Sequence, residues 1–486
     1  MCLYKQLIFI VLLLQLEAQD GSSNSHYTAP RTKKTTNRPN RTNIVMIIII
    51  GISVLVYIGI SLGLKPVRIG SKALDSLAFS LNLRKPFYAV IIDAGSTGSR
   101  VLAFSFHESI IDSNLILDDE LFEQIKPGLS SFADDPAKGA ESLESLINKA
   151  KNVIPKSEWQ HTPLSMKATA GLRLLPKEKA NKLLEECEKM FRNSGFLTSK
   201  NSVSIMDGTD EGIFSWFTVN FLLDRLTPQS HQNTVAALDL GGGSTQVTFA
   251  PDSNHVKGQE KHIFSINAFN NNISIYTHSY LGMGLMAARK AILTYGQNLE
   301  TEENTPSAGS RVEIRSECIN PIISTDWSYG GVDYLVKGPL NGTHKVVKTQ
   351  NFGGVDEDRP VVRFAECLQI VKNYVATIVN KPLGLENREI MAFSYYFDRA
   401  TEVGLIDPFS GGVVTVGTFL KQATESCDYP NTDQPFMCLD LTFIYVLLRD
   451  GFDLQPATKL QLYKKINSHE LSWALGAAFN ILQNGL

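Results

Sequence analysis

The longest uninterrupted run of hydrophobic positions lies near the N-terminus, and the hydrophobic runs that follow it are short. Residues 44–64 (IVMIIIIGISVLVYIGISLGL) carry no charge, and about 20 apolar residues suffice for a helix to cross a bilayer core. A buried core helix of that length normally shows a polar face. We therefore expect a transmembrane helix over 44–64, a stalk over 65–85 and a globular part from residue 86 onward.

Short apolar runs in the globular part predict strands that lead into polar turns. Four such runs are FYAVII, LSMKATA, VSIM and VAAL, at residues 87–92, 164–170, 203–206 and 235–238. A longer apolar run over 213–223 has the length of a helix. At 486 residues the chain is long enough for two ordinary lobes after its front end, and two lobes allow a cleft between them.

The charges that flank residues 44–64 predict the orientation of the helix. Five cationic residues precede it and three follow it, namely Arg31, Lys33, Lys34, Arg38 and Arg41 against Lys65, Arg68 and Lys72. The positive-inside rule places the heavier positive flank in the cytosol. We expect residues 1–43 to be a cytosolic tail and everything after Leu64 to lie in the secretory lumen or outside the cell, as in a single-pass type II membrane protein.

A second apolar segment competes with this orientation. Lys5 followed by residues 7–16 (LIFIVLLLQL) looks like the n- and h-regions of a cleavable signal peptide. Cleavage there would reverse the later helix and leave the large domain in the cytosol. The sequence leaves open whether residues 1–20 act as a cleaved signal, but the cysteines and glycosylation acceptors favour the first orientation.

Four of the six cysteines lie in the C-terminal third, an even count that suits two disulfides in an oxidising compartment. Four cysteines permit three pairings, and sequence order favours Cys318–Cys367 with Cys427–Cys438. None has the CxxC spacing of a zinc site. Asn272 and Asn341 begin N-x-S/T sequons and are the expected glycosylation sites.

The overall charge excludes some partners. The 46 basic and 49 acidic side chains leave a net charge of -3, so no global field recommends nucleic acid or an anionic surface. We therefore expect a small-molecule partner. The oligomeric state is not readable from the sequence.

A repeated motif carries the candidate chemistry. DAGSTGSR (93–100) follows the first predicted strand, DLGGGSTQ (239–246) follows the fourth, and a further strand continues after each. Glycine-rich turns point several backbone N–H groups at one anion, and hydroxyls add donors. Asp93 and Asp239 place carboxylates where a hard divalent cation and its waters would bridge to phosphates. One copy alone is a weak signal, but two copies in matched contexts predict two facing phosphate loops with a metal between them.

Two segments between the copies add candidates. Thr169 and Arg173 offer a hydroxyl and a fixed charge, although such a strand-to-helix junction is usually structural. Glu211, in DGTDEG (207–212), lies at or near the N-terminus of the predicted helix, where the helix dipole stabilises the ionised form. An ionised Glu near bound phosphates can accept a proton from attacking water, and a helix-capping acid is the alternative.

Taken in chain order, these motifs resemble the apyrase conserved regions of the ecto-nucleoside triphosphate diphosphohydrolases. The resemblance runs from about Pro86 to the C-terminus and includes ATAGLRLL, SYYFD (394–398) and SWALG (472–476). The details DAGSTG, FADD (132–135) and AFSYYFD (392–398) are most similar to the secretory-pathway types five and six.

The resemblance implies an α/β, actin-like (ribonuclease-H-like) fold of two lobes with the nucleotide in the cleft between them. The first lobe would span residues 86–205, completed by about 465–486, and the second lobe 206–464. Ca²⁺ or Mg²⁺ would be the cofactor. Water would attack the terminal phosphorus with no phosphoenzyme.

The resemblance also assigns roles residue by residue. Glu211 matches the general base that activates the attacking water. Asp93 and Asp239 match the acids that hold the metal through its waters, and Thr169 and Gln246 match residues that bind the metal shell or orient the water. The two phosphate loops match Gly95, Ser96, Thr97, Gly98, Gly241, Gly242, Gly243 and Ser244.

Base recognition is the least specific part of the resemblance. Tyr395 and Tyr396 fall where the family places aromatic residues near the base, and core packing is the alternative for both. Trp473 is expected to be structural. Many surface-membrane members have a His two residues after the loop serine, where this chain has Gly98, as in the diphosphate-preferring branch.

The expected function is metal-dependent hydrolysis of the terminal phosphate of nucleoside diphosphates, with GDP and UDP ahead of triphosphates. It would support glycosylation in the lumen of the Golgi or endoplasmic reticulum; the cell surface and a released soluble form are other expected locations. One alternative is a broad-specificity apyrase acting on extracellular ATP and ADP. Two others are a different enzyme of the actin-like superfamily and a non-catalytic membrane receptor on an apyrase scaffold.

Overall fold

The computed structural model describes residues 50–51, 54, 75, 84–109, 114–227, 233–269, 271–297, 311–348, 356–378 and 380–486. The chain divides into two units. The first contains Met1–Pro86 and His107–Ile116, and within it Ser109 Oγ donates a hydrogen bond to Asp75 Oδ2 at 3.1 Å. The second contains Phe87–Phe106 and Leu117–Leu486 and holds the candidate site.

The expected membrane helix lies outside the described residues, apart from Ile50, Gly51 and Val54, which are helical. The predicted signal segment over 1–20, the tail and most of the stalk lie outside them as well. Within the described ranges, no helix is both long enough and apolar enough to span a bilayer.

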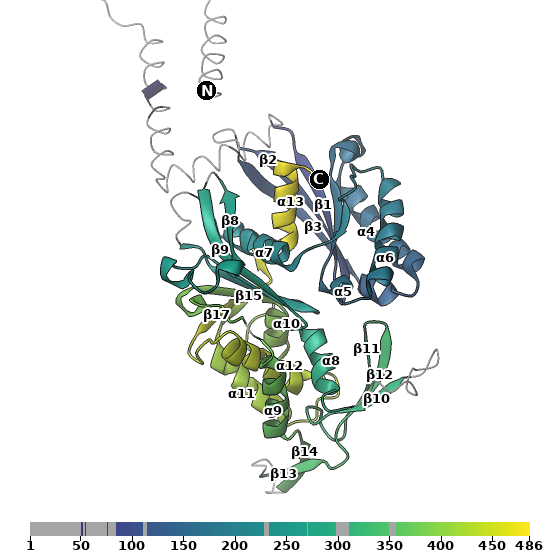
Figure 1. Cartoon of the computed structure of the whole chain (residues 1–486), viewed down its shortest axis with the longest axis vertical. Coiled ribbons are helices and arrows are strands. Elements are labelled where there is room, and N and C mark those ends of the chain that lie inside the picture. The colour runs from purple at the N-terminus through teal and green to yellow at the C-terminus, as the bar shows by residue number, and fades with distance from the viewer. Residues whose placement is uncertain are drawn as a thin grey trace, which may run out of the picture. The chain divides into compact units, whose positions relative to one another are not determined.

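The first three predicted strands belong to one mixed five-stranded sheet (Figure 1). Its order is β3-β2-β1-β4-β5, with bounds β1 Phe87–Ala94, β2 Ser99–Glu108, β3 Leu115–Ile125, β4 Leu164–Ala168 and β5 Val203–Ile205. β1 pairs antiparallel with β2 and parallel with β4. Apolar residues of α4 (Pro136–Val153) and α6 (Lys177–Arg192) share a core with this sheet.

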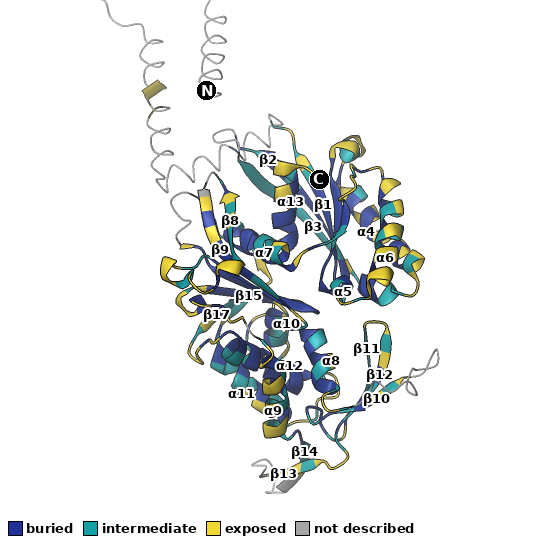
Figure 2. Ribbon diagram, in the orientation of Figure 1, coloured by how far each residue is buried: buried dark blue, intermediate teal, exposed yellow. Residues whose placement is uncertain are grey.

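A second, seven-stranded sheet has the order β16-β17-β15-β6-β7-β9-β8. Its strands are β6 Ala236–Leu240, β7 Ser244–Phe249, β8 Ile263–Ala268, β9 Asn271–Leu281, β15 Ile390–Ser394, β16 Gly412–Thr415 and β17 Lys459–Leu462. It shares a core with helices α8 Leu285–Leu293, α9 Phe364–Val375, α10 Tyr395–Glu402, α11 Val416–Cys427 and α12 Met437–Val446. Figure 2 shows the strands largely buried and the outer faces of α4 and α6 exposed.

The two sheets repeat one local arrangement, which explains the duplicated motif. In each, an antiparallel hairpin (β1–β2 or β6–β7) has a parallel strand beside its first member (β4 or β15). The register is also the same, because Asp93 faces Arg100 across one hairpin and Asp239 faces Gln246 across the other. Residues at the same place in the two copies of the motif therefore occupy equivalent places in the two sheets.

Two helices connect the sheets. α7 (Gly208–Leu222) contacts β6, β7 and β9, whereas α13 (Trp473–Asn484) contacts β1 and also α7. The five-stranded sheet draws its strands from 87–205 and the seven-stranded sheet from 236–462. The division into lobes at 86–205 with 465–486 and at 206–464 stays a proposal that agrees with these strand positions.

Smaller elements complete the second half of the chain. A three-stranded sheet contains β10 Val312–Arg315, β11 Ser324–Tyr329 and β12 Val332–Lys337, and β13 Thr343–Lys348 pairs with β14 Asp356–Val361. Cys318 is bonded to Cys367 and Cys427 to Cys438, the pairing favoured by sequence order. The second bond joins the end of α11 to the start of α12.

Candidate active site

The turn between β1 and β2 is closed by a hydrogen bond from Gly95 N–H to Gly98 O at 3.1 Å. A side chain at Gly98 has no room, because a Cβ there would lie 2.9 Å from Ile125 O at the end of β3. Gly98 therefore shapes the turn without lining the pocket. A histidine at this position would have to displace the end of β3.

The turn between β6 and β7 repeats this geometry, with Gly241 N–H donating to Ser244 O at 3.0 Å. The two turns also touch each other, since a Cβ on Gly242 would overlap Ser96 Oγ and lie 3.0 Å from Thr97 Cγ2. Residues of α8 donate backbone hydrogen bonds to Gly241 O and Gly242 O at 2.9 Å and so fix the second turn. Glycine is thus required at position 242 by the close approach of the Ser96 and Thr97 side chains.

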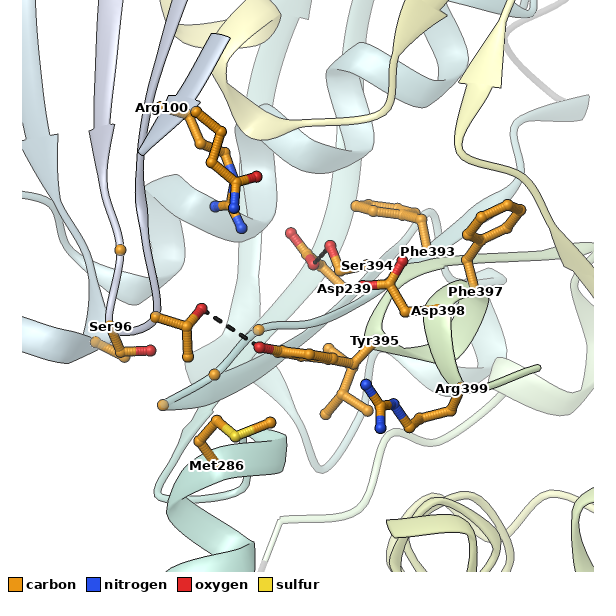
Figure 3. A pocket seen from close by; sticks show the side chains of 18 of the residues that line it. Ser96, Arg100, Asp239, Met286, Phe393, Ser394, Tyr395, Phe397, Asp398 and Arg399 are labelled. Atoms are coloured by element: carbon orange, nitrogen blue, oxygen red, sulfur yellow. Dashed lines mark hydrogen bonds between the residues drawn. The ribbon is translucent and has the colours of Figure 1, made fainter. Parts of the chain in front are cut away.

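Both turns line one pocket of about 630 Å³. Figure 3 shows Tyr395 reaching from α10 toward the turn that carries Ser96, where its hydroxyl hydrogen-bonds Thr97 Oγ1 at 3.3 Å. The expected site residues that line the pocket are Asp93, Gly95, Ser96, Thr97, Thr169, Glu211, Asp239, Gly241, Gly242, Gly243, Ser244 and Tyr395. The structure thus brings together residues that lie as much as 302 positions apart in the sequence (93 to 395).

Three buried carboxyl groups share this pocket. Asp93 is 4% exposed, and Glu211 and Asp239 are 7% exposed. Burial raises the pKa of all three, to about 8 for Glu211 and about 6 for Asp239, and Asp93 and Asp239 raise the pKa of Glu211 further. Three ionised carboxylates in one pocket repel one another, and each added positive charge there lowers this cost.

Each carboxyl group has a defined partner. Arg100 Nη1 donates to Asp93 Oδ2 at 2.8 Å, and Asp239 accepts from Ser394 Oγ at 2.6 Å and from Ser215 Oγ at 3.3 Å. Glu211 Oε2 accepts from Arg173 and, at 3.0 Å, from Gln246 Nε2. These bonds occupy one oxygen of Glu211 and leave Oε1 for another donor.

The site has the features of one that holds a divalent cation through water. Asp93 Oδ1 and Gln246 Oε1 are buried and have no hydrogen-bond partner among the described residues. Nowhere in the described ranges do three His, Cys, Asp or Glu side chains come close enough to ligate a metal directly. Unpaired acceptor oxygens without a chelating cluster fit a hydrated Ca²⁺ or Mg²⁺.

Two glycines one turn apart explain the position of Glu211. Asp207 caps α7 by accepting a hydrogen bond from Thr209 N at 2.7 Å. Side chains at Gly208 or Gly212 would overlap Ser279 or Thr277 of β9, and a Cβ on Gly212 would lie 2.7 Å from Thr248 Oγ1 of β7. The first turn of α7 therefore lies directly on the sheet, which brings Glu211 against Gln246.

We expect Gly212→Ala to destabilise the protein by about 2 kcal/mol, because the new methyl group overpacks the helix–sheet contact. The sign is diagnostic, since Gly→Ala in an unconstrained helix stabilises by up to about 1 kcal/mol. Thermal or denaturant unfolding measures the change. A gain in stability would contradict the close packing of α7.

Three expected residues do not line the pocket. Gln246 is 1% exposed and acts through Glu211 and through a 2.8 Å bond to Ser244 Oγ. Gly98 belongs to the first turn as described above. Tyr396 is fully buried in the core of the seven-stranded sheet, which favours its core-packing alternative. Trp473, expected to be structural, lines the pocket and is 3% exposed.

Sequence reasoning singled out Arg173 and Gln246 but missed Arg100, Ser394 and Ser215 as partners of the carboxylates. Arg100 and Gln246 occupy equivalent register positions in the repeated motif, and this equivalence is a signal for Arg100. Ser394 ends β15 with φ +57°, an uncommon conformation for a residue other than glycine. No local pattern marks Ser394 or Ser215 as a partner of Asp239.

The comparisons with known proteins agree with this geometry. Ectonucleoside triphosphate diphosphohydrolase 5 of Mus musculus is 42% identical over 403 residues, covering 82% of this chain and 88% of the relative. Nucleoside diphosphate phosphatase ENTPD5 of Homo sapiens is 42% identical over 402 residues, with the same coverage. Ectonucleoside triphosphate diphosphohydrolase 6 of Mus musculus is 40% identical over 409 residues, covering 82% of each chain. The resemblance to types five and six is confirmed.

A solved structure shows that the fold is shared more widely. The structure of nucleoside triphosphate hydrolases from Neospora caninum has a TM-score of 0.56 at 12% identity and covers 87% of this chain and 97% of that chain. Residues 82–485 match the GDA1/CD39 (nucleoside phosphatase) family. The chain therefore belongs to the GDA1/CD39 (nucleoside phosphatase) family.

Proposed function

We propose that this chain hydrolyses the terminal phosphate of nucleoside diphosphates, with GDP and UDP favoured over triphosphates, and depends on Ca²⁺ or Mg²⁺. The observation that carries the proposal is the contact between two glycine turns beside three buried carboxyl groups in one pocket. The name of the human relative, nucleoside diphosphate phosphatase, supports the choice of substrate.

The phosphates would bind to the two turns. Backbone N–H groups from Ser96 to Gly98 and from Gly242 to Ser244, with the Ser96 and Ser244 hydroxyls, would donate to phosphate oxygens. Asp93 and Asp239 would hold the cation through water, assisted by Thr169 and Gln246. A cation bound there supplies positive charge to the phosphate oxygens.

Glu211 would act as the general base. Arg173 and Gln246 fix Oε2, so Oε1 accepts the proton of a water molecule that attacks the terminal phosphorus. Burial raises the Glu211 pKa to about 8, and the Arg173 guanidinium opposes this by favouring the ionised form. The products are a nucleoside monophosphate and orthophosphate, with no covalent phosphoenzyme.

The proposed location is the secretory lumen, with a single N-terminal membrane helix over 44–64. Two disulfides support an oxidising compartment. The proposed glycosylation sites Asn272 and Asn341 are both exposed, as the modification requires. Removal of nucleoside diphosphates left by glycosyltransferases would be the role of the enzyme there.

Phosphate release by the full-length chain in detergent tests the proposal. The substrates are GDP, UDP, ADP, CDP, GTP and ATP, each with Ca²⁺, with Mg²⁺ and with EDTA. We expect fast, EDTA-sensitive release from GDP and UDP and slower release from the triphosphates. Equal or faster release from ATP would favour a broad-specificity apyrase, and no release from any nucleotide would favour a receptor on an apyrase scaffold.

A further inference from the structure

One face of α10 lines the pocket beyond the phosphate turns. Tyr395, Asp398, Arg399 and Glu402 are spaced as neighbours on one helical face, and all four line the pocket. Tyr396 and Ala400, on the opposite face, are fully buried. The pocket therefore presents an aromatic ring beside charged groups, the combination that recognises a nucleobase by stacking and hydrogen bonding.

Two carboxylates hold the Arg399 side chain in place. Arg399 Nη1 donates to Asp440 Oδ2 at 3.3 Å, and Arg399 Nη2 donates to Glu402 Oε1 at 3.0 Å. Asp440 is fully buried and also binds Arg289. The Arg399 guanidinium lies 5.9 Å from the centre of the Tyr395 ring. Because its Nη1 and Nη2 donors serve this network, Arg399 acts as support for the ring.

Asp398 differs from its neighbours on this face. Its side chain is exposed to the pocket and has no hydrogen-bond or ion-pair partner among the described residues. Figure 3 shows Asp398 on α10, separated from Arg399 and Tyr395. Burial raises the pKa of Asp398, and the positive charges of Arg399, Lys464, Arg100 and Lys126 oppose this rise without forming an ion pair. A carboxylate in this setting is a free acceptor that faces incoming ligand.

An ionised carboxylate only accepts hydrogen bonds, and this restricts the bases that it tolerates. Guanine presents an N1–H and an exocyclic amine side by side, and uracil presents an N3–H. Adenine at N1 and cytosine at N3 present a lone pair at the corresponding place. A lone pair facing Asp398 leaves the carboxylate unpaired and repelled, which is how polar sites discriminate.

We infer that Asp398 selects the base, accepting the ring N–H of guanine or uracil and rejecting adenine and cytosine, while Tyr395 stacks on the ring. The inference rests on the proposed function, because it concerns the base of the same nucleotide. It gives GDP and UDP a shared chemical feature despite their different ring sizes. Asp398 is therefore a specificity residue and takes no part in the attack on phosphorus.

Asp398→Asn in the full-length chain tests this assignment, because an amide offers both a donor and an acceptor. We expect the GDP:ADP and UDP:CDP ratios of kcat/KM to fall at least about tenfold, mainly through a higher KM for GDP and UDP. Inhibition by GMP should weaken relative to inhibition by AMP. Asp210→Asn is the matched control, since Asp210 is exposed and does not line the pocket, and it should leave both ratios unchanged.

Two outcomes would overturn the inference. One is an unchanged ratio, and the other is an equal loss for all four nucleotides, which would mean that Asp398 acts only through the cationic side chains around it. Asp398→Ser is a second variant in case the first is unstable. If the wild type hydrolyses no nucleotide, the proposed function fails, but calorimetric binding of GMP against AMP to wild type and variant still decides the role of Asp398.

Discussion

Glu211→Gln should lower kcat for GDP by about 10²- to 10⁴-fold, the usual contribution of a general base. Glutamine has the same shape and keeps an oxygen that accepts from both Arg173 and Gln246, but it cannot take a proton from water. The fold should persist because no atom is lost from the buried site. Steady-state phosphate release and thermal unfolding, measured together, separate loss of chemistry from loss of structure.

The matched control for this prediction lies in the same helical turn. Asp210 is exposed, and it does not line the pocket. Asp210→Asn should therefore retain activity within about twofold of the wild type, as expected for a surface substitution. Undiminished turnover by Glu211→Gln would remove Glu211 from the mechanism and leave the helix-capping role.

Without divalent cations, the protein should lose stability as the pH rises. The folded-state pKa values of Asp93, Asp239 and Glu211 lie above their ordinary values of about 4, reaching about 6 for Asp239 and about 8 for Glu211, chiefly because of burial. A raised carboxyl pKa contributes stability below the unfolded pKa, and this contribution is lost as the pH rises through the folded one. The free energy of unfolding should therefore fall across a window from about pH 4 to pH 8.

The expected loss in EDTA across that window is several kcal/mol, because each unit of pKa shift corresponds to about 1.4 kcal/mol. Excess Ca²⁺ or Mg²⁺ should flatten the decline, because cation charge offsets the ionised carboxylates. Melting temperatures measured across this window, with EDTA and with each cation, give the comparison. An identical decline with and without cation would argue against a cation at this site, and Asp239→Asn should itself reduce the decline in EDTA.

The strands that carry the site were predictable from local pattern. Residues 87–92, 164–170 and 235–238 correspond to β1, β4 and β6. β1 pairs with β2 and β4, and β6 pairs with β7 and β15, so the two copies of the motif have equivalent neighbours. The helix was predicted over 213–223, but α7 begins five residues earlier, at Gly208. Glycines disfavour an isolated helix, and here close packing on β9 outweighs that preference.

The contacts that tune the carboxylates were not predictable. Ser394 is 155 residues from Asp239, and Arg173 is 38 residues from Glu211. Such bonds depend on how separate strands and helices meet, which no local pattern encodes. The two tyrosines illustrate the same limit, because β15 ends at Ser394 and α10 starts at the next residue. That boundary turns Tyr395 to the pocket and Tyr396 to the core.

The packing of α13 has a consequence for biosynthesis. Gly476 lies so close to α7 that a Cβ would be 2.5 Å from Phe214 O, and Gly476 N–H donates to Thr218 Oγ1 at 3.0 Å. α13 also contacts β1, the first strand in chain order. The residues of α13 are nevertheless translated after every other described element. A nascent chain still on the ribosome therefore carries β1 and α7 without this apolar cover. The apolar surface that α13 later covers is therefore prone to aggregation until α13 has been made and has packed.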